Sequence, residues 1–230
     1  KLLTDFMRAN TERGFLCALA EHGMTAADVQ FVDTVIDNDF KEAANPDAGA
    51  GRKAFEATMF DYETQALLDG RVDVVFTKNV QPARLLRLYG DRLRCIYDLL
   101  DARDPDHLIN GNPRIVTISG NVVRDAPELV TRYLQVLVRG AARAAADKAA
   151  TTRIWAAEIG VEPQDVAASY RGDYHATVWP SLDEAMRHRL RVQIDFLHRH
   201  GYLERDVDIN AWAQPQFLAD AYRREGLTAA

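Results

Sequence analysis

The stretch DGRVDVVFTKNVQPARLL, residues 69–86, changes character twice and decides the predicted fold class. It begins with an Asp-Gly turn and continues as a largely apolar run, which is typical of a strand in a parallel sheet covered on both faces. Three polar residues interrupt the run, and an amphipathic segment follows them. The stretch therefore predicts a strand over 72–76 that leads, through a polar junction, into a helix over 81–88.

The same alternation of helix and strand extends along the first half of the chain. In chain order, the sequence predicts a helix from about 10 to 23, a strand over 29–32, a loop over 37–52, a helix from about 53 to 68, the stretch above, and a strand over 93–97. Loops between these segments are short, apart from the one over 37–52. Strands alternating with helices indicate an α/β fold with a parallel sheet.

The chain changes class in its second half. Residues 98–113 are dense in Asp, Pro, Asn and Gly, which suits a connection, and a β-branched run over 114–119 predicts one further strand. Pro127 is well placed in a first helical turn, so a long helix is predicted over 126–150. Four or five further helices and no convincing strand are expected from there to the C-terminus.

Composition limits the possible functions. A chain of 230 residues can bury a substantial core, and its net charge of −6 provides no overall positive field that would attract nucleic acid. No apolar stretch approaches the roughly 18 residues of a membrane span. The two cysteines, Cys17 and Cys95, both lie in apolar segments outside any C-x-x-C pair, and we expect buried thiols.

Polar residues lie where a parallel α/β sheet binds its ligands. Thr77, Lys78 and Asn79 fall between a predicted strand end and the positive N-terminus of the next helix, where a hydroxyl, an ammonium and an amide would hold a carboxylate, sulfonate or phosphate-like group. Asn10 and Thr11, before their own helix, form a second candidate of the same kind.

A simpler explanation stands beside the ligand-binding one. Polar residues precede most helices because they satisfy free backbone groups there. Lys78 favours a ligand, because a helix cap does not need an ammonium. The phosphate-loop, dinucleotide-binding, zinc-protease and nucleophile-elbow motifs are missing from the sequence, so neither a cofactor nor a metal is expected.

Several segments occur in an order that resembles a known family. They are the helix–turn–strand of 18–32, the "helix, Gly, x, Val-Asp" step of 66–75, the Pro-Glu-Leu-Val helix start at 127–130 and the segments of 193–203. Together they are similar to the nitrate/sulfonate/taurine class of periplasmic solute-binding proteins of ABC transporters. Segments 21–23 and 212–218 look closer to an enzyme branch of that superfamily, the sulfinate desulfinases.

The resemblance implies a two-lobed, Venus-flytrap fold with parallel-rich sheets flanked by helices. Residues 1–105 would form the second α/β lobe, and residues 106–230 would form the returning strand and helical part of an incomplete first lobe whose N-terminal portion is missing. The implied function is a monomeric, periplasmic substrate-binding protein. It would capture a small anionic solute in a cleft between the lobes and present it to the membrane permease of an ABC importer.

Two other functions fit the same resemblance. One is a desulfinase-like, cytoplasmic enzyme acting on an aromatic sulfinate or a related small acid. That branch needs a cysteine nucleophile in an early part of the first lobe, so the resemblance assigns no catalytic role to Cys17 or Cys95. The other is a sensor domain that reports the same kind of ligand.

Overall fold

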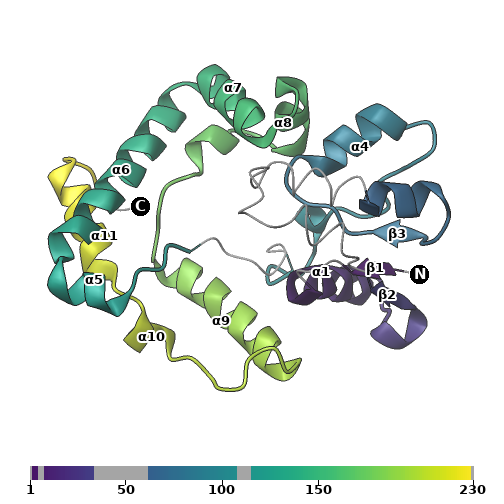
Figure 1. Cartoon of the computed structure of the whole chain (residues 1–230), viewed down its shortest axis with the longest axis horizontal. Helices are drawn as coiled ribbons and strands as arrows, with labels where there is room; N and C mark the ends of the chain where they lie inside the picture. The colour runs from purple at the N-terminus through teal and green to yellow at the C-terminus, as the bar shows by residue number, and fades with distance from the viewer. Residues whose placement is uncertain (1, 5–7, 34–61, 108–114, 229–230) are drawn as a thin grey trace, which may run out of the picture. The chain divides into compact units, whose positions relative to one another are not determined.

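The computed structural model describes residues 2–4, 8–33, 62–107 and 115–228. The predicted loop over 37–52 and the first part of the helix predicted from 53 lie outside these ranges. The chain divides into two compact units (Figure 1). Unit 1 contains Lys1–Gly111 and Trp155–Tyr170, and unit 2 contains Asn112–Ile154 and Arg171–Ala230.

A three-stranded parallel sheet organises unit 1. Its strands are β1 (Leu2–Thr4), β2 (Phe31–Asp33) and β3 (Val74–Val75), in the order β2-β1-β3. The central strand pairs with both neighbours, so that Leu2 aligns with Phe31 on one side and with Val74 on the other. Because the strands are parallel, their carboxyl ends meet at one edge of the sheet, which we call the carboxyl edge.

Helices follow the strands of unit 1. The regular elements are α1 (Arg8–Glu21), η1 (Ala26–Asp28), α4 (Gln81–Tyr89), η3 (Leu99–Asp101), α8 (Pro163–Ser169) and the part of α7 (Lys148–Ile159) from residue 155 onward. Residues 62–68 are also helical. The helix predicted over 81–88 is confirmed by α4. Its amphipathic spacing specifies which side of the helix is apolar, and Pro82 in the first turn specifies where the helix begins.

A partly buried ion pair holds α8 against α4, although the two helices are far apart in the sequence. Arg87 donates from Nε and Nη2 to the two carboxylate oxygens of Asp165, at 2.7 and 2.8 Å. Asp165 is only 1% exposed, and the guanidinium of Arg87 holds the pKa of that carboxyl below its usual range. The two parallel hydrogen bonds give this contact a defined geometry as well as an attraction.

Close packing brings α1 against the end of β3. Gly14 has no side chain, and a Cβ placed there would overlap the ring of Phe76, the residue that follows β3. The next residue of the helix, Phe15, meets the same ring edge-on with centroids 5.8 Å apart and meets Phe31 at 6.0 Å. These aromatic contacts join α1 to Phe31 of β2 and to Phe76, which directly follows β3.

Unit 2 is helical in the residues that the structure describes. It contains α5 (Gly120–Asp125), α6 (Pro127–Ala146), the first part of α7, η4 (Tyr174–Ala176), α9 (Glu184–Arg199), α10 (Ile209–Trp212) and α11 (Pro215–Arg224). Its core lies between α6 and α11, where Val138, Leu218, Ala221 and Tyr222 are buried together.

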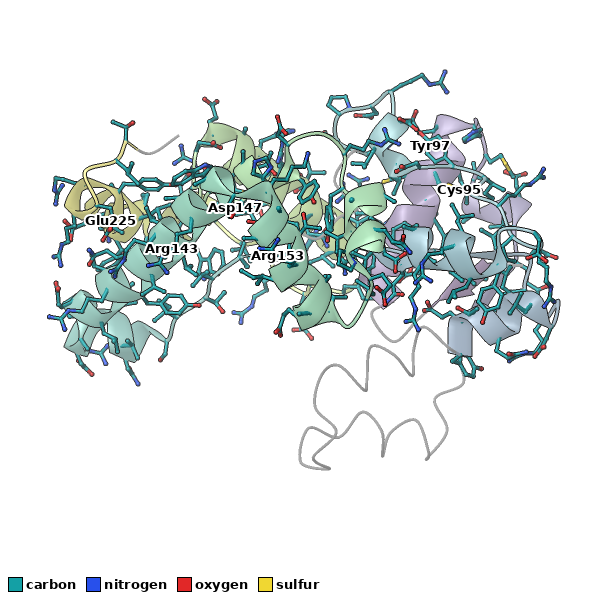
Figure 2. The ribbon with its side chains drawn as sticks, turned by 90° about the horizontal axis from the view of Figure 1, so that it is seen from above. Cys95, Tyr97, Arg143, Asp147, Arg153 and Glu225 are labelled. Carbon is teal, nitrogen blue, oxygen red and sulfur yellow. The ribbon has the colours of Figure 1, made fainter. Side chains whose placement is uncertain are left out.

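The long helix predicted over 126–150 is divided in two at Asp147. The backbone of Asp147 is extended (φ −144°, ψ 93°), and its carboxylate accepts a hydrogen bond of 2.9 Å from the N–H of Ala150. Figure 2 shows Asp147 between Arg143 on α6 and Arg153 on α7. An Asp that caps the following helix ends one helical run and begins another, which the continuous Ala-rich pattern conceals.

Part of unit 2 presents apolar side chains to solvent. Leu129, Tyr133 and Val136 form one stripe on α6, at the spacing of successive helical turns, and are 58%, 49% and 58% exposed. Ile115 and Val116 are also about half exposed. Residues 115–119 form no strand, and no backbone hydrogen bond joins residues 115–118 to another described segment.

The prediction of a two-lobed, parallel-rich binding-protein fold is wrong. The described residues hold three short strands, all in one sheet, and the rest of their regular structure is helical. Two predicted strands, over 93–97 and 114–119, have no regular structure in their described residues. Their β-branched and apolar composition favours a strand only where a neighbouring strand pairs with it, and composition alone does not supply that neighbour. No helix among the described residues is long and apolar enough to cross a membrane.

The Gly14 contact gives a stability prediction. Gly14→Ala should lower the free energy of unfolding by about 1 kcal/mol, because overlap with Phe76 costs about 1–3 kcal/mol while the helix propensity of Ala returns about 1 kcal/mol. Gly140→Ala is the matched control. It lies within α6 with no atom near the added methyl group, so it should stabilise the protein. Thermal unfolding of both variants provides the test, and equal midpoints would contradict the packing.

Candidate functional site

The carboxyl edge of the sheet is the natural place for a ligand. In the order β2-β1-β3, β1 and β3 are hydrogen-bonded neighbours, and ligands of parallel α/β sheets bind beyond the carboxyl ends of such strands. In Figure 1, α4 lies above the strands and α1 lies beside β1.

The junction from β3 to α4 is a tight turn. Val80 is completely buried and anchors the turn. Asn79 has a left-handed backbone (φ 58°), which Asn tolerates better than most residues, and the carbonyl of Lys78 accepts a 3.2 Å hydrogen bond from the N–H of Gln81. Thr77 and Lys78 are half-buried, and Asn79 is exposed.

Helix capping does not account for these polar residues. The residue in the cap position of α4 is Val80, which makes no side-chain hydrogen bond to the helix. The helix dipole therefore places partial positive charge beside Thr77 and Lys78 without a capping side chain to offset it. This arrangement favours an anion.

The other predicted pair lies inside α1 rather than before it. The helix begins at Arg8, so the capping role predicted for Asn10 and Thr11 is wrong, and they are 7% and 1% exposed. The side-chain oxygen of Asn10 is buried and has no hydrogen-bond partner among the described residues. Asn10 lies four residues before Gly14, hence on the helix face that contacts Phe76, and helical side chains lean toward the N-terminus.

A buried cation lies one turn further along α1. Arg13 is 4% exposed and donates a 2.9 Å hydrogen bond to the backbone carbonyl of Asp106. Burial lowers the pKa of Arg13 below its ordinary value, although a guanidinium remains charged in proteins. Positive charge is therefore present inside unit 1 at the middle of α1 as well as at Lys78.

Neither cysteine has the surroundings of a nucleophile. Cys17 is buried as predicted, and burial raises the pKa of its thiol, which disfavours the reactive thiolate. The prediction that Cys95 is buried is wrong, because it is exposed and its Sγ donates a 3.4 Å hydrogen bond to the carbonyl of Tyr97 (Figure 2).

Glu21 holds the loop after η3 against the end of α1. Its carboxylate accepts hydrogen bonds from the N–H groups of Arg103 and Asp104, at 2.9 and 3.1 Å, and meets Nδ1 of His107 at 2.7 Å. These donors, with the N–H of Arg103 contributing most, lower the pKa of Glu21 to about 2. The cluster is a structural support for α1, because its hydrogen bonds are already formed within the protein.

Unit 2 has an open hollow of about 780 Å³ beside α9 and α10. Its charged groups are largely engaged with each other, since Arg191 binds the carboxylates of Asp195 and Asp206, and Asp208 caps α10. In the described part of the chain, no group of three or more His, Cys, Asp or Glu side chains is arranged to hold a metal ion. The hollow is therefore a weaker candidate than the carboxyl edge.

Comparison with known proteins points to desulfinases. No family model matches the chain. A segment of 115 residues, half of the chain, is 29% identical to 2'-hydroxybiphenyl-2-sulfinate desulfinases of Rhodococcus erythropolis and Rhodococcus qingshengii, and it spans 32% of their length. Two solved structures match 97% of this chain and 70% of their own. They are the desulfurization enzyme DSZB (TM-score 0.72, 22% identity) and a cysteine-to-serine variant of DSZB in complex with biphenyl-2-sulfinic acid (TM-score 0.69, 20% identity).

These findings correct the identity expected from the sequence. The chain has the fold of DSZB, and the proteins that match it in sequence are desulfinases. The predicted solute-binding protein of an ABC importer, with a membrane permease as its partner, is therefore wrong. The segments behind that prediction encode turns and helix packing, which do not distinguish a transport protein from an enzyme of similar architecture.

Sequence reasoning missed two features of unit 1. Gln81 begins α4, and its buried side-chain oxygen has no hydrogen-bond partner. Arg13 is buried in α1. The signal available for Gln81 was its place directly after the polar junction. No signal in the sequence indicated the burial of Arg13, because its carbonyl partner lies 93 residues away.

The Glu21 cluster predicts a pH dependence of stability. Because the folded pKa of about 2 lies below the ordinary value of 4.5, the cluster should stabilise the protein fully above pH 4.5 and lose this effect as the pH falls toward 2. Glu21→Gln should therefore lower the melting temperature at pH 7, and the difference from wild type should shrink progressively between pH 4.5 and pH 2. Glu204→Gln, at an exposed position, is the control and should change little at any pH.

Proposed function

We propose that this protein is a desulfinase-like enzyme that removes the sulfinate group from an aromatic sulfinate or a related small acid. The sequence match over 115 residues, joined to the shared fold, is the observation that supports this proposal most strongly. In the proposed reaction, R–SO₂⁻ and water yield R–H and HSO₃⁻. The carbon–sulfur bond breaks, a proton from water takes the place of sulfur on carbon, and sulfur leaves as hydrogen sulfite.

The carboxyl edge is proposed to bind the sulfinate. The ammonium of Lys78 supplies a full positive charge, and the N-terminus of α4 adds partial positive charge at the same place. Thr77 and Asn79 provide a hydroxyl and an amide that donate hydrogen bonds to the sulfinate oxygens. An anion between a cation and a helix N-terminus is held by charge-assisted hydrogen bonds, which are stronger than those between neutral groups.

Asn10 and Thr11 are proposed to form the opposite wall of the same site. The contact between Gly14 and Phe76 supports this placement, since it joins their helix to the β3–α4 junction. The bond-breaking step itself is not assigned to a residue of the described ranges, because neither cysteine is activated there. A cytoplasmic location is proposed together with the enzymatic function.

Replacing Lys78 tests the anion site. Lys78→Met keeps the length of the side chain but removes its charge, and it should weaken binding of biphenyl-2-sulfinate at least about tenfold, because a hydrogen bond to a charged group contributes about 1.5–3 kcal/mol. Isothermal titration of wild type and variant at low ionic strength measures the difference.

Lys148→Met is the matched control for this experiment. Lys148 lies in unit 2, where its ammonium donates a 2.9 Å hydrogen bond to the carbonyl of Gly172, so its removal should leave the affinity unchanged. Equal losses in the two variants would show a general effect of net charge, and an unchanged affinity in Lys78→Met would refute the assignment of the anion to the β3–α4 junction.

A further inference from the structure

The long helix α6 is apolar on two opposite sides. On one side, Val138 is completely buried in the core that α6 forms with α11. The other side carries Leu129, Tyr133 and Val136, which remain about half exposed. Successive residues of an α-helix are rotated by about 100°, so Val136 and Val138 point in nearly opposite directions. The exposed side is therefore a second apolar surface of the helix and not an edge of its core.

The exposed side has the spacing of a helix–helix interface. Leu129, Tyr133, Val136, Gly140 and Arg143 follow one another at intervals of four, three, four and three residues. We call these five residues the α6 seam. Alternating intervals of three and four keep side chains on one line of a helix, and two helices pack side by side along such a line. Apolar residues that are exposed singly are common on proteins and need no such order.

The α6 seam is complementary in size to a copy of itself that runs in the opposite direction. Gly140 has open space where a side chain would stand, whereas Tyr133 carries the bulkiest side chain of the seam. In an antiparallel pair centred near Val136, Tyr133 of each copy lies over Gly140 of the other. Because Gly140 has no side chain, the two helices can approach closely at this contact.

Charge favours the same antiparallel direction. A parallel pair would place Arg143 against Arg143 of the other copy, and like charges repel. An antiparallel pair places Arg143 near the first turn of the other α6, where Glu128 lies. Arg132 and Arg139, which lie beside the seam, already form ion pairs with Glu128 and Glu225. The two helix dipoles also run in opposite directions in this arrangement, so that each positive end lies beside a negative one.

We infer that the α6 seam is the interaction surface for a second copy of this chain, which docks on it as an antiparallel helix pair. A two-fold arrangement of this kind is self-complementary, because each contact occurs twice. One helix pair is a small interface, so the expected Kd is on the order of 10–100 μM. The inference concerns unit 2 alone and is independent of the proposed function.

Sedimentation velocity over a range of protein concentrations tests the dimer. Val136→Lys should raise the Kd at least about tenfold, because it brings two ammonium groups together at the centre of the pair. Ile154→Lys is the matched control, since Ile154 is 65% exposed on α7, outside the seam, and its replacement should leave the Kd unchanged. A wild type that remains monomeric above the expected Kd overturns the inference, and the seam then belongs to a different partner. Equal weakening in both variants also overturns it.

Cross-linking tests the direction of the pair. In a Cys95→Ser background, which removes the exposed native thiol, a short bis-maleimide reagent should join two copies of Val136→Cys. Leu129→Cys is equally exposed at 58%, but it should not be joined to its own copy. An antiparallel pair separates the two copies of residue 129 by about 14 residues of helix, or about 21 Å. Equal cross-linking at the two positions, or none at residue 136, contradicts the antiparallel pair.

Discussion

The arrangement of unit 1 depends on how closely α1 approaches the end of β3. Only a glycine at position 14 lets the helix backbone come within contact of the Phe76 ring, and Phe15 then extends this contact to β2. This approach fixes α1 relative to the β3–α4 junction. Everything proposed for the carboxyl edge, from the anion at Lys78 to the buried amide of Asn10, requires these two segments to remain at this separation.

Support for α1 comes from its other end. Glu21 gathers backbone and side-chain donors from the loop after η3, and Arg13 reaches the carbonyl of Asp106 in the same loop. Long-range polar contacts therefore hold the helix at both its middle and its end, while its first turn keeps an unpaired amide. This pattern is expected of a binding site. Polar groups that bind the ligand lack hydrogen-bond partners within the protein, whereas polar groups elsewhere are paired.

Sequence reasoning succeeded where a local rule decides the structure. The helix from Gln81 follows from amphipathic spacing and a proline in the first turn, and the polar junction before it lies where the pattern placed it. It failed where the outcome depends on distant partners. The run over 93–97 has strand composition but no neighbouring strand, Asp147 interrupts an apparently continuous helix, and Asn10 was taken for a cap because nothing local marks Arg8 as the first helical residue.

The β-branched run at residues 115–118 has a consequence for handling the protein. Its backbone donors and acceptors make no hydrogen bond to another described segment, and its Ile and Val side chains are half exposed. Such a segment is prone to pair with an extended segment of another molecule. Intermolecular β-strand pairing would satisfy the backbone N–H and C=O groups of residues 115–118 together. Preparations of this polypeptide should therefore be limited by concentration rather than by temperature, and a lysine in place of Val116 would act as a gatekeeper against self-association.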